Sequence, residues 1–71
     1  MSMKFKIGRV QPEEESRIDR LIYRVYGSYT HKFLMAVVNA NPLVDFTNLL
    51  VNTELILPDR NWIFTQELAN A

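Results

Sequence analysis

The chain has 71 residues, so we expect a single domain, because domains usually contain about 100–150 residues. Basic and acidic side chains balance at eight each, which argues against nucleic acid as a partner. The absence of cysteine excludes disulfides and zinc–thiolate sites. No apolar run approaches the ~20 residues of a membrane span, and the N-terminus has no signal-peptide pattern. We therefore expect a protein made in a cytoplasm that needs an economical core or a partner surface for stability.

The first predicted element is a strand over residues 4–10. Charged and apolar side chains alternate there, a pattern typical of a half-buried strand, with Phe5 and Ile7 expected to face the core. Gly8 is expected to mark a bulge or the close approach of another backbone. A polar loop containing Pro12 should follow.

A first helix is predicted over residues 16–26. Ser16 and Asp19 have the spacing of a capping box, although a helix that begins at Pro12 is also compatible with the sequence. Gly27 should end the helix in a left-handed conformation. The expected apolar stripe consists of Ile18, Leu21, Ile22 and Val25.

A second helix is predicted over residues 30–40. Thr30 can cap its N-terminus, and Asn41-Pro42 should close it, because proline disfavours helical geometry in the residue before it. The expected buried stripe consists of Phe33, Leu34, Val37 and Val38.

The second strand is predicted over residues 53–57, after a loop in which Leu49 and Leu50 fold back onto the core. Asn52 can supply a positive φ at the turn into the strand, and Pro58 should stop it. Leu55 and Leu57 should share one face, and Ile56 and Glu54 the other. The order predicts an α+β domain over residues 1–58, with two helices packed on a two-stranded antiparallel sheet.

Residues 59–71 form an extension with no clear period. Trp62, Ile63 and Phe64 are three large apolar residues that lie beyond an already enclosed core, so we expect them to dock on a partner. Ile56, on the outer face of its strand, adds to this expected binding surface. In the free protein the extension should then be mobile. The alternative is that it folds back on the domain's own sheet.

Residues 17–59 resemble the tail protein X family of phages and related contractile particles, itself a LysM-like family. The family usually has glycine-aspartate-threonine before the first helix, where this chain has Glu14, Glu15 and Ser16, and glycine at the position of Asn52. The matching motifs are Ile18-Asp19, Leu21-Ile22, Tyr23-Arg24-Val25-Tyr26-Gly27, Asn39-Ala40-Asn41-Pro42 and Leu55-Ile56-Leu57-Pro58-Asp59.

The resemblance implies a LysM-like βααβ fold and a non-enzymatic structural role in a phage-type tail. It places the protein in the virion, at the baseplate or hub, with tube, spike, hub or wedge subunits as partners and without a cofactor. Two alternatives remain: a peptidoglycan-binding LysM module and a small cytoplasmic adaptor. The changed loop before the first helix disfavours glycan binding, since in LysM domains that loop helps to hold the glycan.

The other polar and aromatic residues are expected to have structural roles, and no catalytic or metal-binding set stands out. Asp19 should cap a helix, and the run of glutamates at 13–15 should interact with the helix dipole and solvent. The arginines of the first helix should form a solvated face or salt bridges to a neighbouring subunit. We expect packing for Tyr23 and Tyr26, exposure for His31, and bonds to loop backbone for Asn39 and Asn41.

Overall fold

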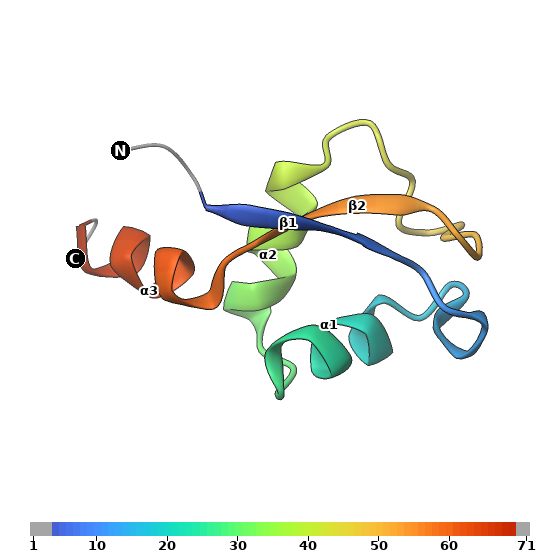
Figure 1. Ribbon diagram of the computed structural model, residues 1–71, viewed down its shortest axis with the longest axis horizontal. Helices are drawn as coiled ribbons and strands as arrows, with labels where there is room; N and C mark the ends of the chain where they lie inside the picture. Colours follow the sequence, from blue (N-terminus) through green and yellow to red (C-terminus); the bar gives the residue numbers. More distant parts are fainter. Residues whose placement is uncertain (1–3, 70–71) are drawn as a thin grey trace.

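The computed structural model describes residues 4–69, which form two strands, three α-helices and a short 3₁₀ turn (Figure 1). The predicted strand–helix–helix–strand order and α+β class are confirmed. A third helix follows, in a segment for which no element was predicted; residues 70 and 71 of the predicted extension lie outside the described part. The elements are β1 (Phe5–Arg9), η1 (Pro12–Glu14), α1 (Ile18–Tyr26), α2 (His31–Ala40), β2 (Glu54–Pro58) and α3 (Arg60–Ala69).

The two strands are antiparallel, with Ile7 opposite Ile56 and Gly8 opposite Leu55. Leu55 is buried on the helix-covered face, as predicted. The prediction for β1 is wrong: Phe5 and Ile7 are 53% and 56% exposed, on the face that points away from the helices. Period-two alternation gives two faces without saying which is buried, and the register with β2 decides it here.

Gly8 lies on the inner face of β1, where Leu57 packs directly over it. A Cβ atom at this position would come within 2.5 Å of Leu57 Cδ1. The pairing between Phe5 and Arg9 is regular, one residue to one, so Gly8 marks a close approach by a side chain and not a bulge.

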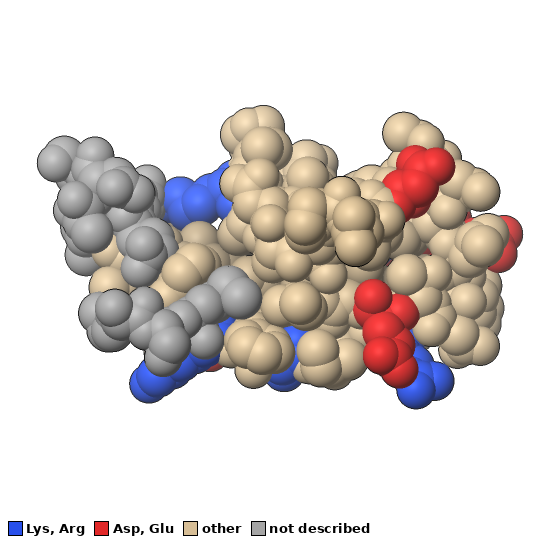
Figure 2. All heavy atoms as spheres, turned by 90° about the horizontal axis from the view of Figure 1, so that it is seen from above, with Lys and Arg blue, Asp and Glu red and all other residues tan. Residues whose placement is uncertain are grey.

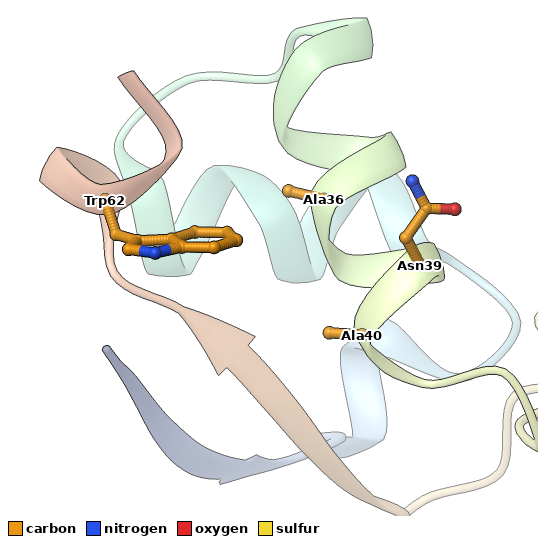
Figure 3. Close-up of a pocket in the computed structure, with 4 residues that line it drawn as sticks. All are labelled: Ala36, Asn39, Ala40 and Trp62. Atoms are coloured by element: carbon orange, nitrogen blue, oxygen red, sulfur yellow. The ribbon is translucent and has the colours of Figure 1, made fainter. Parts of the chain in front are cut away.

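The helices lie on one side of the two-stranded sheet, and the core lies between the helices and the sheet (Figure 3). On the molecular face shown in Figure 2, uncharged residues occupy the centre and most of the visible acidic side chains lie in the right half. The buried apolar residues are Val10, Leu21, Ile22, Tyr26, Phe33, Val37, Leu49, Leu55, Leu57 and Ile63.

The start of α1 differs from the prediction. Arg17 is the N-cap and makes no side-chain cap, and the Asp19 carboxylate pairs with the Arg17 guanidinium at 3.0 Å. Ser16 has a φ of 54° and donates its backbone N–H to the Leu49 carbonyl at 2.8 Å. The predicted capping box therefore does not form. The acid that reaches back to a free backbone N–H is Glu14, which accepts from Gln11 N one turn earlier.

The other predicted helix boundaries are confirmed. Thr30 Oγ1 accepts from Phe33 N at 3.3 Å and caps α2, and Asn41 follows its last residue. Asn52 has a φ of 70°, as expected for the turn before β2. Of the two loop leucines, Leu49 is buried but Leu50 is exposed, so the prediction that both fold back is half right.

Gly27 ends α1 with a φ of 83°, and a Cβ atom there would meet nothing within 4 Å. The cost of a side chain is therefore conformational and not steric. We expect Gly27→Ala to lower the free energy of unfolding by about 1–2 kcal/mol, measured by chemical denaturation. Gly27→Asn should cost less, because asparagine tolerates left-handed geometry. A stabilised alanine variant would contradict the role assigned to this residue.

Candidate partner-binding surface

Three apolar side chains that are not fully buried lie on the sheet face that points away from the helices: Phe5 and Ile7 from β1 and Ile56 from β2. We call these residues the outer sheet face. Ile7 lies directly opposite Ile56, and Phe5 lies one pair further along the same face. Ile56 is half-buried, and its position is the one predicted. An exposed cluster of large apolar side chains is typical of an interaction site.

The Asn41 side chain holds β2 in place under this face. Its Nδ2 donates to the carbonyls of Val37 and Ile56, at 2.7 and 2.8 Å, and its Oδ1 accepts from Ile56 N at 2.7 Å. Both backbone groups of Ile56 are thereby satisfied at the edge of the sheet. Asn41 was expected to bond loop backbone; it instead joins the end of α2 to a strand. Asn39, two residues earlier, is exposed.

The Tyr26 hydroxyl makes a second link to β2, donating to the Pro58 carbonyl at 2.7 Å. Burial, with a smaller contribution from the Asp59 carboxylate, raises the pKa of Tyr26 to about 12 from 10.0. The folded protein therefore holds the proton more tightly than the unfolded chain. The resulting stability is complete below pH 10.0 and is lost as the pH rises through about 12.

We expect Tyr26→Phe to lower the free energy of unfolding by about 1–2 kcal/mol at neutral pH, because the Pro58 carbonyl loses its donor. The difference from wild type should shrink between pH 10.0 and about 12, measured by urea denaturation. Tyr23, which was expected to pack, is instead exposed on α1, so Tyr23→Phe is the matched control. It should change neither the free energy of unfolding nor its dependence on pH. A pH-independent difference for Tyr26→Phe would refute the assigned titration.

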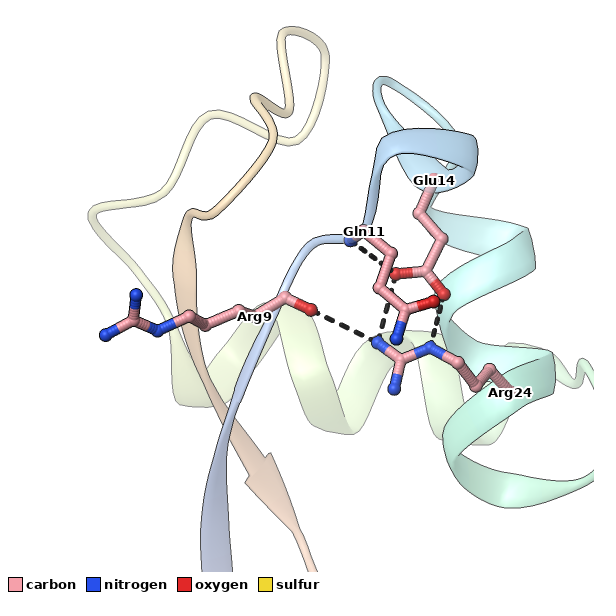
Figure 4. Close-up of polar contacts among 4 residues, drawn as sticks. All are labelled: Arg9, Gln11, Glu14 and Arg24. Carbon is pink, nitrogen blue, oxygen red and sulfur yellow. Dashed lines mark hydrogen bonds and ion pairs between the residues drawn. The ribbon is translucent and has the colours of Figure 1, made fainter.

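Glu14 and Arg24 form an ion pair that joins η1, α1 and β1 (Figure 4). Glu14 is only 1% exposed. Arg24 Nη2 donates to Glu14 Oε1 at 3.0 Å and to the Arg9 carbonyl at 3.1 Å. The hydrogen bond from Arg24 holds the pKa of the Glu14 carboxyl below its ordinary value. Glu14 was expected to interact with the helix dipole and solvent, and Arg24 with solvent or a neighbouring subunit. The two instead pair with each other, because the 3₁₀ turn directs Glu14 inward toward α1.

The predicted docking arm is a helix that packs on the domain itself. The Asp59 carboxylate caps α3 by accepting from Asn61 N and Trp62 N, at 3.0 and 3.3 Å. Ile63 is 4% exposed and belongs to the core, so its assignment as a partner-binding residue is wrong. Phe64 is half-buried and meets Phe33 edge-on, with ring centres 5.8 Å apart. Asp59 before an apolar run was an N-cap signal that the sequence interpretation missed.

Trp62 lies beside a pocket of about 300 Å³ that it shares with Ala36, Asn39 and Ala40 of α2 (Figure 3). The indole Nε1–H is buried and has no acceptor within the described part of the chain. Trp62 is otherwise half-buried against the core. Its predicted role in partner binding stays a prediction.

Among the side chains that the structure describes, no group of three or more could hold a metal ion, and no helix within residues 4–69 is long and apolar enough to cross a membrane. Comparison with known proteins found no matching family model, no matching curated protein and no matching solved structure.

Proposed function

We propose that this protein is a structural component of a phage or phage-like contractile tail, at the baseplate or hub, where it joins tube, spike or wedge subunits. The observation that carries the proposal is the outer sheet face. Phe5 and Ile7 are more than half exposed and adjacent to Ile56. The exposed part of this cluster adds nothing to the stability of the isolated chain, whereas burying it against a partner would contribute about 1 kcal/mol per side chain, roughly half the value for a fully exposed one.

Two further features support a protein partner over a glycan. Glu14, which stands where the resembling family has glycine, is buried and its carboxylate is already bound to Arg24. This part of the loop is therefore engaged by the fold itself. The zero net charge also gives the free chain little protection against association, which suits a protein that is held within an assembly.

The proposal predicts that the outer sheet face is needed for incorporation and not for folding. We expect Phe5→Thr combined with Ile7→Thr to reduce the amount of this chain in purified tail particles by about tenfold, equivalent to about 1.4 kcal/mol. Threonine keeps the preference for a strand, so the unfolding midpoint of the free protein should change little. Quantitative mass spectrometry of the particles measures the first effect and circular dichroism the second.

Leu50→Thr is the matched control, since Leu50 is exposed to the same extent as Ile7 but lies in the loop before β2. It should leave incorporation unchanged. Normal incorporation of the double variant would contradict the assigned face. Absence of the wild-type chain from tail particles made by cells that encode it would contradict the tail assignment itself.

A further inference from the structure

Within residues 4–65, the backbone of β1 has groups without a hydrogen-bond partner on the edge away from β2. In an antiparallel pair, residues alternate between those that bond across to the partner strand and those whose N–H and C=O point outward. Both backbone groups of Ile56 bind the Asn41 side chain, so Ile56 and its partner Ile7 form an outward-pointing pair. The Pro58 carbonyl binds the Tyr26 hydroxyl, so its partner Phe5 is also outward-pointing.

The two edges of the sheet are therefore unequal. Asn41 and Tyr26 close the edge of β2. On β1, the outward carbonyl of Arg9 accepts from Arg24 Nη2, which closes that end. No hydrogen bond from residues 4–65 reaches the outward backbone groups of Phe5 and Ile7. An open strand edge of this kind is a template for pairing with another chain.

The side chains along this edge specify what kind of strand would fit. Phe5 and Ile7 project from the outer face, and Lys4 and Lys6 project from the opposite face. Both lysines are exposed, and neither forms an ion pair with a described carboxylate. Residues that face each other across an antiparallel pair lie on the same side of the sheet. A complementary strand would thus place apolar residues beside Phe5 and Ile7, and acidic residues beside the lysines.

We propose that residues 4–7 bind an extended segment of a partner protein, with alternating acidic and apolar side chains, as a third strand of the sheet. This inference deepens the proposed function and rests on it for the identification of the partner as a tail subunit. A second copy of this chain is a poorer occupant. Pairing two β1 strands would bring the lysines of both copies to the same side of the joined sheet, where like charges repel.

The test uses the full chain and a synthetic peptide that alternates glutamate and valine, with a lysine–valine peptide as the control. NMR titration and amide hydrogen exchange are the readouts. We expect the glutamate–valine peptide to bind at least about tenfold more tightly than the lysine–valine peptide. Its affinity should fall as the salt concentration is raised. In the free chain the amides of Phe5 and Ile7 should exchange quickly and those of Lys6 and Gly8 slowly. Peptide binding should slow the hydrogen exchange of the Phe5 and Ile7 amides.

Two variants separate edge pairing from non-specific attraction. Methylation of the Ile7 backbone nitrogen, introduced by chemical synthesis, blocks the edge without removing a bond to β2 and should reduce binding at least about tenfold. Lys4→Glu combined with Lys6→Glu should reverse the preference toward the lysine–valine peptide. Equal binding of both peptides, undiminished binding after methylation, or a dimer through β1 that excludes the peptide would each overturn the inference.

The outcomes also distinguish this inference from the proposed function. Peptide binding at the β1 edge by a chain that never enters tail particles would uphold the edge and refute the tail assignment. Absence of peptide binding, together with normal particle incorporation of the Lys4→Glu, Lys6→Glu variant, would refute the edge and uphold the tail assignment.

Discussion

Arg24→Met is expected to lower the free energy of unfolding by about 2–3 kcal/mol at neutral pH. The change leaves the Glu14 carboxylate, 1% exposed, without its charged partner. It also removes the donor to the Arg9 carbonyl at the edge of β1. Methionine keeps most of the apolar stem of the arginine, so the loss reports the ion pair and not packing. Urea denaturation of the two proteins measures it.

The pH dependence of this loss supplies a control. The pKa of Glu14 is lower in the folded protein than its ordinary value of 4.5. Its contribution to the free energy of unfolding is therefore complete above about pH 4.5 and is lost as the pH falls through the pKa of the folded state. The difference between wild type and Arg24→Met should therefore shrink below pH 4.5. Adding Glu14→Leu to Arg24→Met should recover part of the stability, since no charge is then left buried. A loss that is equal at acidic and neutral pH would contradict the ion-pair explanation.

Ile63→Ala is expected to lower the free energy of unfolding by about 2–4 kcal/mol, because it leaves a cavity among the core side chains. Ile63 is 4% exposed in that core. Thermal and urea denaturation measure the effect, and Thr65→Ala, at an exposed position of α3, is the control that should change little. An unchanged melting temperature combined with loss of particle incorporation would instead restore the interpretation of residues 59–71 as a docking arm.

The features that were predictable from sequence depend on local backbone chemistry. Gly27 and Asn52 each adopt a left-handed backbone conformation, and Thr30 caps a helix. Each of these roles depends only on residues a few positions away in the sequence. Leu55 and Leu57 were placed correctly because Pro58 and Asn52 bracket a short strand with an unambiguous apolar face. These signals were sufficient for the βααβ order.

The features that were missed depend on contacts between distant residues. Glu14 and Arg24 are ten residues apart, and their pairing requires the 3₁₀ turn that the sequence pattern did not reveal. The inner face of β1 was misassigned because Phe5 and Ile7 are its most apolar residues, whereas Gly8 and Val10 occupy the helix side. Ile63 was predicted to dock on a partner because the two strands and the first two helices were expected to complete the core without it.

The candidate binding surface in the structure differs from the one expected from the sequence, whereas the proposed type of function is the same. In the C-terminal extension, which was predicted to dock on a partner, Ile63 is part of the protein's own core. Ile56 lies on the outer sheet face together with Phe5 and Ile7, which were expected to be buried. The candidate binding surface is therefore a sheet that Asn41 holds in place, and not the mobile extension expected from the sequence. A preformed strand edge loses less conformational entropy on binding than a mobile arm, which favours partner association.

Site-specific photo-crosslinking in intact tail particles tests the outer sheet face most directly. A photoreactive phenylalanine analogue at position 5 should crosslink this chain to another tail subunit, identified by mass spectrometry. The same analogue at Tyr23, which is 64% exposed on α1, should give little crosslinking to that subunit. Crosslinking from position 23 with none from position 5 would contradict the proposed interface.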